Sequence, residues 1–155
     1  MNSDRVNRWL TLGANLGVLV GIVLLIVELN QNRDMMRAQT RHDLAAGIVD
    51  LLQVAASNEQ LADVMYRAES GGELTPRELY QFEARANALF RYWEDAHYQY
   101  RMGLYDEIEF GKQLGAWRNS FAKSGRQVTY WCRVRLLYSP EFMIEMDGLI
   151  PDGAC

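Results

Sequence analysis

The chain has 155 residues and a net charge of −4, with 49% hydrophobic and 23% charged residues. This length accommodates one modest domain and an anchoring segment, and the composition is typical of a folded chain. Charges cancel within the first 29 residues, so the excess of acid lies on the remainder. An acidic domain lacks the positive surface that phosphate backbones attract, which argues against nucleic acid as a partner.

An uncharged stretch runs from Trp9 to Val27. As a helix it would be about 28 Å long, close to the roughly 30 Å hydrocarbon core of a bilayer. Trp9 suits an interfacial position, and no small-x-small cleavage site follows the stretch. We therefore expect a short polar tail (1–8), a transmembrane helix (9–29), a helical domain (30–150) and a C-terminal tail (151–155). A buried core helix and a cleaved signal peptide are the alternatives.

Glycine recurs at every fourth position of this stretch, at Gly13, Gly17 and Gly21. On a helix these residues share an arc of about 80°, on which Leu24 and Glu28 also lie. A face without side chains lets another helix approach closely. The pattern predicts that these five residues form a helix–helix interface. The alternatives are that glycine is simply common in membrane spans, and that Glu28 is an interfacial carboxylate reaching water.

Orientation in a membrane depends on weak signals. Arg33, Arg37 and Arg41 fall on the opposite side of the helix, and we expect them to face lipid phosphates or water. Arginine numbers on the two sides of the span differ by only one. Cys132 and Cys155 lack metal-ligand spacing, and we do not expect the terminal Cys155 to form a disulfide. Reduced cysteines favour a cytoplasmic C-terminal domain.

Helix start and stop signals recur throughout residues 30–150, and no convincing strand pattern appears. Thr75-Pro76-Arg77-Glu78 combines an N-cap hydroxyl, a proline in the first turn and a capping-box glutamate. Ser57 and Gln60 form a second candidate capping box. The fold class predicted is all-α, with one N-terminal transmembrane helix continuing into a small antiparallel helical bundle. The expected helices run from the anchor to Ser57, then about Asn58–Gly71, Thr75–Gly103, Asp106–Ser124, Val128–Leu137 and Ser139–Leu149.

The helix after Thr75 carries an apolar face and a polar seam beside it. Glu94 and His97 have the Glu-x-x-His spacing of di-iron bundles, but the only other histidine, His42, has Gln39 in the glutamate position. We therefore predict no metal and no cofactor. A structural seam is favoured, with a pKa-shifted Glu94/His97 pair in a cleft as the alternative. Cys132 is expected to be a small buried thiol. The seam consists of Glu83, Asn87, Glu94, His97 and Arg101.

Two stretches carry a resemblance to a family: VELNQNRDMMRAQTRHDL after the anchor, and WEDAHYQYRMGLYDEIEF further on. Together with a later tryptophan helix, they resemble a family of small single-span bacterial membrane proteins without an assigned activity. The likeness covers residues 16 to 149. It implies a location in the bacterial inner membrane and supplies no catalytic residues.

Three functions remain compatible with these features. The first is a non-enzymatic interaction or assembly protein that contacts membrane lipid and, through its glycine face, either itself or another membrane protein. The second is a homo-oligomeric pore or transporter with a ring of Glu28 and with Asn32 below it. The third is a small enzyme that uses Glu94 and His97; we lean against an enzyme.

Overall fold

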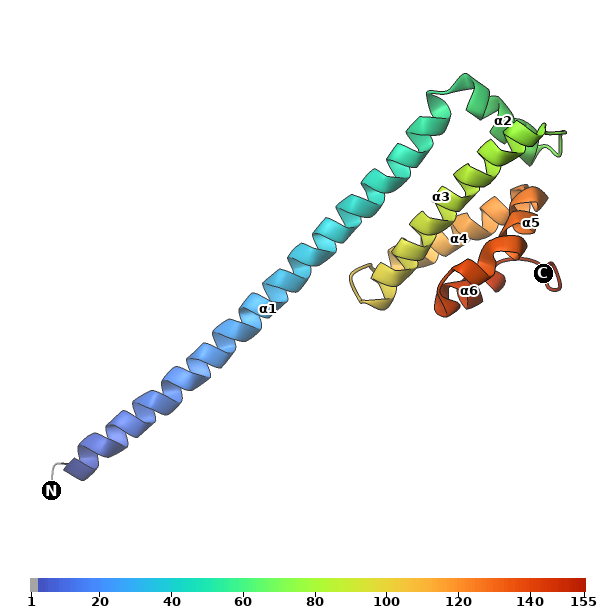
Figure 1. The fold of residues 1–155 in the computed structure, drawn as a ribbon. Helices are drawn as coiled ribbons and strands as arrows, with labels where there is room; N and C mark the ends of the chain where they lie inside the picture. Colours follow the sequence, from blue (N-terminus) through green and yellow to red (C-terminus); the bar gives the residue numbers. More distant parts are fainter. Residues whose placement is uncertain (1–2) are drawn as a thin grey trace. The chain divides into compact units, whose positions relative to one another are not determined.

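The computed structural model describes residues 3–155, and the regular secondary structure in this range is helical (Figure 1). This confirms the all-α class, with a long apolar N-terminal helix followed by a helical bundle. The elements are α1 (Ser3–Ala56), α2 (Glu59–Glu69), α3 (Pro76–Arg101), α4 (Glu107–Lys123), α5 (Gly125–Val134), the short 3₁₀ helix η1 (Arg135–Leu137) and α6 (Pro140–Asp147).

The chain divides into two units, Met1–Gln39 and Thr40–Cys155, and α1 contributes to both. α1 begins at Ser3, inside the segment expected to be a polar tail, because no helix breaker separates that segment from the apolar stretch. Residues 1 and 2 lie outside the described range. The boundary at Gln39 is later than the predicted start of the domain at residue 30. The second unit begins four residues before Leu44, the buried residue of α1.

Local capping sets most of the helix ends. The Thr75 hydroxyl accepts a hydrogen bond from the Glu78 backbone N–H at 3.4 Å, and the Glu78 carboxylate accepts from the Thr75 N–H at 2.8 Å, which confirms the predicted capping box. The second candidate box is wrong. Asn58 is the N-cap of α2, and its Oδ1 accepts from the Leu61 N–H at 3.0 Å. An asparagine oxygen reaches the orphan amides at a helix start as well as a serine hydroxyl does.

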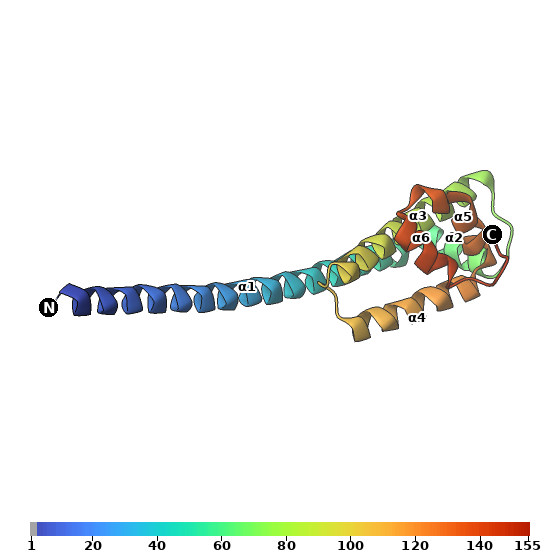
Figure 2. The same cartoon turned by 90° about the horizontal axis from the view of Figure 1, so that it is seen from below.

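α3 is the central helix of the second unit and contacts α2, α4, α5 and α6 (Figures 1 and 2). Phe90 is completely buried at its middle, and its ring centroid lies 5.5 Å from that of Trp93 and 5.2 Å from that of Trp131. Edge-to-face and tilted aromatic pairs at such distances add to the stabilisation from burial alone. The main core comprises Leu44, Phe90, Trp93, Ala96, Phe110, Trp117, Phe121, Trp131, Tyr138, Phe142, Met146 and Leu149.

Two parts of the core differ from the simple helical pattern. Ile108 matches the apolar spacing of α4 but is 71% exposed, whereas Phe110 is buried and stacks on Tyr100 at 4.1 Å between ring centroids. Val64, Ala68 and Phe82 form a second, smaller cluster between α2 and α3. The first turn of α4 faces the main core through Phe110 and not through Ile108, because an aromatic ring buries more apolar surface than isoleucine.

The last turns of α1 join the domain through a narrow contact with α3. Leu44 is buried, and its backbone carbonyl accepts a hydrogen bond from the Tyr92 hydroxyl at 2.9 Å. A Cβ added at Gly47 would lie 3.4 Å from the Tyr92 ring, so the glycine permits close approach here. Val49 and Leu52, which belong to the predicted apolar face, are 56% and 57% exposed. The contact is centred on Tyr92 and leaves the end of α1 incompletely covered.

Candidate functional site

The glycine face in the first unit is open. A Cβ added at Gly13, Gly17 or Gly21 would meet no atom within 4 Å, and Leu24 on the same face is 58% exposed. Glu28 is also exposed. In the described range, α1 is the one helix long and apolar enough to cross a membrane, and none of its most apolar 18-residue window is buried. Nothing in this unit covers the five residues that the sequence predicts as an interface.

The three arginines that follow the apolar stretch differ in their surroundings. Arg41 forms an ion pair with Glu109 of α4, with Nη2 2.8 Å from Oε1, although its side chain remains 72% exposed. Arg41 is thus also held by the domain, and the expectation that it faces lipid phosphates or water stays a prediction. Helical phase alone does not show that α4 would lie beside this position. Arg33 and Arg37 are exposed, and a lipid-facing role for these two stays a prediction.

Glu94 of the polar seam holds two neighbours. Its Oε1 accepts a hydrogen bond from the Ser139 backbone N–H at 2.8 Å, and its Oε2 accepts from Arg91 Nη1 at 2.7 Å. These bonds outweigh the opposing effect of partial burial, so the pKa of Glu94 lies below its ordinary value. Both oxygens of the ionised Glu94 carboxylate accept hydrogen bonds. Glu94 therefore fixes the N-terminus of α6 and is poorly suited to take up a proton.

The other seam residues also bind the C-terminal segment. Asn87 Oδ1 accepts from the Tyr138 hydroxyl at 2.7 Å, Glu83 pairs with Arg133 at 2.5 Å, and Arg101 pairs with Glu141 at 3.1 Å. All the partners, with Ser139, come from residues 133–141. All four side chains of α3 thus bind the segment from α5 to α6 and attach it to α3. They are Glu83, Asn87, Glu94 and Arg101. This supports the structural interpretation of the seam.

His97 differs from the rest of the seam because it is buried. It is 5% exposed, and the rings of Phe110 and Phe142 lie 6.0 Å and 5.7 Å from its own ring. Burial is the main reason that its pKa lies below the ordinary value, so the imidazole is neutral near pH 7. In residues 3–155 no hydrogen bond holds the ring, and no group of three His, Cys, Asp or Glu side chains is placed to bind a metal ion.

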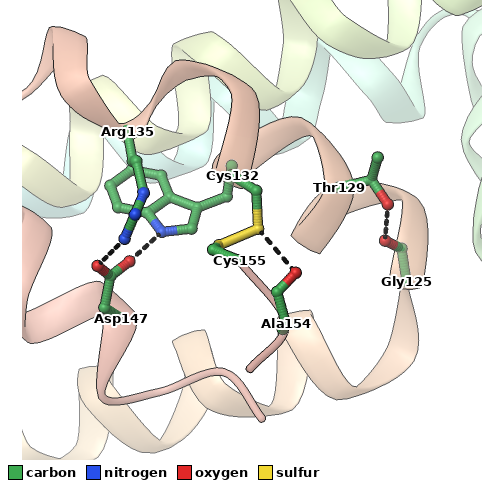
Figure 3. The surroundings of a disulfide bond; sticks show 8 residues. Gly125, Thr129, Cys132, Arg135, Asp147, Ala154 and Cys155 are labelled. Carbon is green, nitrogen blue, oxygen red and sulfur yellow. Dashed lines mark hydrogen bonds and ion pairs between the residues drawn. A yellow bond between two sulfur atoms is a disulfide. The ribbon is translucent and has the colours of Figure 1, made fainter. Parts of the chain in front are cut away.

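The largest departure from expectation is at the cysteines, because Cys132 and Cys155 form a disulfide (Figure 3). Their Cα atoms are 5.2 Å apart, within the range that a disulfide requires. Neither thiol is free, so the prediction of reduced cysteines with a buried Cys132 thiol is wrong. Gly153 has a φ of +74°, and the Ala154 N–H bonds to the Pro151 carbonyl at 3.1 Å. The Pro-Asp-Gly sequence is the turn signal that could have revealed this reversal of the chain.

Beside the disulfide, polar contacts of Asp147 fix the end of α6 to α5 and η1. Trp131 is buried, and its Nε1 donates a hydrogen bond to Asp147 Oδ1 at 2.9 Å. Asp147 also forms an ion pair with Arg135 (Figure 3). These contacts hold the end of α6 near Cys132, which brings the five-residue tail within reach of that cysteine.

Comparisons of the chain with protein-family models, curated proteins and solved structures find no match. The fold and the open glycine face define a class of protein: a helical domain continuous with a helix that is apolar and long enough to span a membrane. The resemblance to small single-span bacterial proteins and the pore with a Glu28 ring stay hypotheses.

Proposed function

We propose that this protein is a non-enzymatic, membrane-anchored interaction protein of the bacterial inner membrane. The observation that carries the proposal is the complete lack of burial along the apolar part of α1. Leu16, Leu19 and Leu25 are 61%, 60% and 59% exposed, and none of the most apolar window is buried. A core helix would be buried, and a contiguous apolar surface of this kind normally meets lipid or another protein.

The glycine face supports assembly in addition to anchoring. In lipid, helices associate through close packing and not through a hydrophobic driving force, so small residues mark contact faces. Gly13, Gly17 and Gly21 are all free of neighbouring atoms, which leaves room for a helix backbone. The proposed interface consists of these glycines with Leu24 and Glu28. The partner is a second copy of the chain or another membrane protein.

Replacing Gly17 with isoleucine tests this interface. The branched side chain would hold the partner backbone away, so we expect the assembly in mild detergent to shift to a smaller mass or to lose its co-purifying partner. Leu19→Ile is the matched control, because it places the same side chain on the opposite face of the helix. An unchanged mass and unchanged partners in Gly17→Ile would refute a role for the glycine face.

We further propose that the domain formed by Thr40–Cys155 lies on the oxidising side of the membrane, which in a bacterium is the periplasm. Structural disulfides form and persist in oxidising compartments, whereas the cytosol keeps thiols reduced. The Cys132–Cys155 bond supports this orientation, with Arg5 and Arg8 on the cytoplasmic side. It reverses the orientation favoured by the sequence, whose basis was reduced cysteines.

Labelling of intact cells with a maleimide that cannot cross membranes tests the orientation. The chain has only two cysteines, so the signal is simple. We expect no labelling before reduction and two labels per chain after an impermeant reductant is added. Cys132→Ser is the control, because it frees Cys155 and should label once without reductant. Labelling of this variant only after the cells are broken would place the domain in the cytoplasm.

A further inference from the structure

The part of α1 that belongs to the second unit has two different sides. One side is buried or half-buried at Thr40, Leu44, Gly47, Ile48, Leu51 and Ala55. A second side lies roughly 130° away around the helix and is exposed at His42, Ala45, Val49, Leu52 and Ala56. The exposed fractions of Val49 and Leu52 are 56% and 57%. This second side is apolar except at His42, and no described residue of the second unit covers it.

The exposed side of α1 follows a strict heptad spacing. Its residues are separated by alternating steps of three and four, and the same alternation continues toward the N-terminus through Ala38, Met35 and Gln31. It then takes in four residues of the glycine face, from Glu28 back to Gly17. We call the whole set, from Gly17 to Ala56, the heptad stripe. None of the Asp, Glu and Arg residues between positions 29 and 56 lies on it. Because an ideal helix drifts about 20° per heptad, a repeat kept this long is typical of helices that supercoil around each other.

A second copy of the chain matches the heptad stripe in direction and in register. Two copies anchored by the span proposed above cross the membrane in the same direction and at the same depth, so each residue of the stripe meets its own counterpart. Gln31 suits such a pair, because its amide offers both a donor and an acceptor and can bond to the same amide of the other copy. A buried polar residue at a central position fixes the register of a coiled coil.

We propose that α1 forms a parallel, two-stranded coiled coil with α1 of a second copy of this chain, through the heptad stripe. The inference rests on the proposed assembly through α1 and names its partner. Val49 and Leu52 take the a and d positions, and a β-branched residue at a with leucine at d favours two strands. From Gly17 to Ala56 the contact is about 58 Å long and about 10 Å wide. It therefore buries roughly 1,200 Å² over both copies, which is the lower end of the range for stable interfaces.

Cross-linking of a single introduced cysteine tests this contact in the full-length protein in mild detergent. Cys132 and Cys155 are joined to each other, so a short bis-maleimide reacts only with the introduced thiol. Val49→Cys and Val54→Cys are matched variants, because both valines are 56% exposed and lie about 140° apart around the same helix. We expect Val49→Cys to form covalent dimer at least about 10-fold faster, because facing thiols have a high effective concentration. Equal rates in the two variants, or no dimer in Val49→Cys, would overturn the coiled coil.

Comparison with Gly17→Ile separates the failure of this inference from the failure of the proposed glycine interface. If Gly17→Ile lowers the mass of the assembly but Val49→Cys gives no dimer, the glycine face acts in assembly and the coiled coil fails. If Val49→Cys forms dimer while Gly17→Ile leaves the mass unchanged, the coiled coil holds and the role of the glycine face fails.

The charge of Glu28 distinguishes a second copy from a different membrane protein. In a parallel pair in register, the two Glu28 carboxylates face each other and repel. Glu28→Gln should therefore strengthen dimerisation about 5-fold, the effect of one pair of like charges in water, as measured by sedimentation equilibrium in mild detergent. Asp50→Asn is the matched control, because Asp50 is exposed and lies off the heptad stripe, and it should leave the dimer unchanged. Weaker assembly in Glu28→Gln would show that a cation of a different partner faces Glu28, and unchanged assembly would show that the two carboxylates do not meet; either result overturns the proposal.

Discussion

Removing the disulfide should destabilise the domain by much less than its loop length suggests. The bond joins residues 23 apart in the sequence. In the chain-entropy model, closing a loop of that length in the unfolded chain is worth about 3.4 kcal/mol at 25 °C. That value assumes that the folded state pays nothing for the same closure.

In this protein, closing the loop also costs conformational entropy in the folded state, because little except the bond holds the tail. Residues 151–155 are exposed, and the last buried side chain is that of Leu149. Tethering a tail of about five residues to a folded domain costs about 2.1 kcal/mol by the same relation. The difference leaves about 1.3 kcal/mol as the expected loss of stability in Cys132→Ser/Cys155→Ser.

Tryptophan fluorescence during guanidinium unfolding measures this loss. Trp93, Trp117 and Trp131 are buried in the domain, whereas Trp9 in α1 is 72% exposed, so the signal reports mainly on the domain core. The native protein with its disulfide intact and the double variant would be compared in the same mild detergent. A loss of 3 kcal/mol or more would show that the tail is ordered without the bond. No loss, together with two free thiols in the native protein, would show that the bond does not form.

Other changes have outcomes that the structure predicts. Phe90→Ala should destabilise the domain by about 3–5 kcal/mol, because it leaves a cavity among five aromatic rings, and the same fluorescence assay would detect this; a loss below 1 kcal/mol would contradict the packing. Glu78 has a pKa lowered to about 2, mainly by its hydrogen bonds with Arg67, from an ordinary 4.5. Its contribution to stability is therefore present above pH 4.5 and is lost as the pH falls toward 2, and Glu78→Gln should flatten this part of the profile. His97 is held neutral by burial, so stability should also decrease as the pH falls below about 6.5. His97→Phe should remove that decrease, and an unchanged pH profile would contradict burial as its cause.

The polar seam shows how far a helical pattern leads toward a site. Spacing along α3 places four polar residues, Glu83, Asn87, Glu94 and Arg101, beside the apolar stripe, because residues three and four apart share a face, whereas the fifth, His97, is buried. It cannot show that Asn87 bonds to Tyr138, 51 residues away, or that Glu94 bonds to Ser139, 45 residues away. The choice between a structural seam and a reactive pair depends on these distant partners.

Local features determine what the sequence alone predicts correctly about this protein. The apolar stretch, the capping box at Thr75, the start of a helix at Asp106 and the helix ends near Gly71 and Gly103 depend on interactions over a few residues. The tertiary structure decides the disulfide and the ion pair of Arg41 with Glu109. Each of these depends on where a distant helix comes to lie, and the packing of the aromatic core fixes that position.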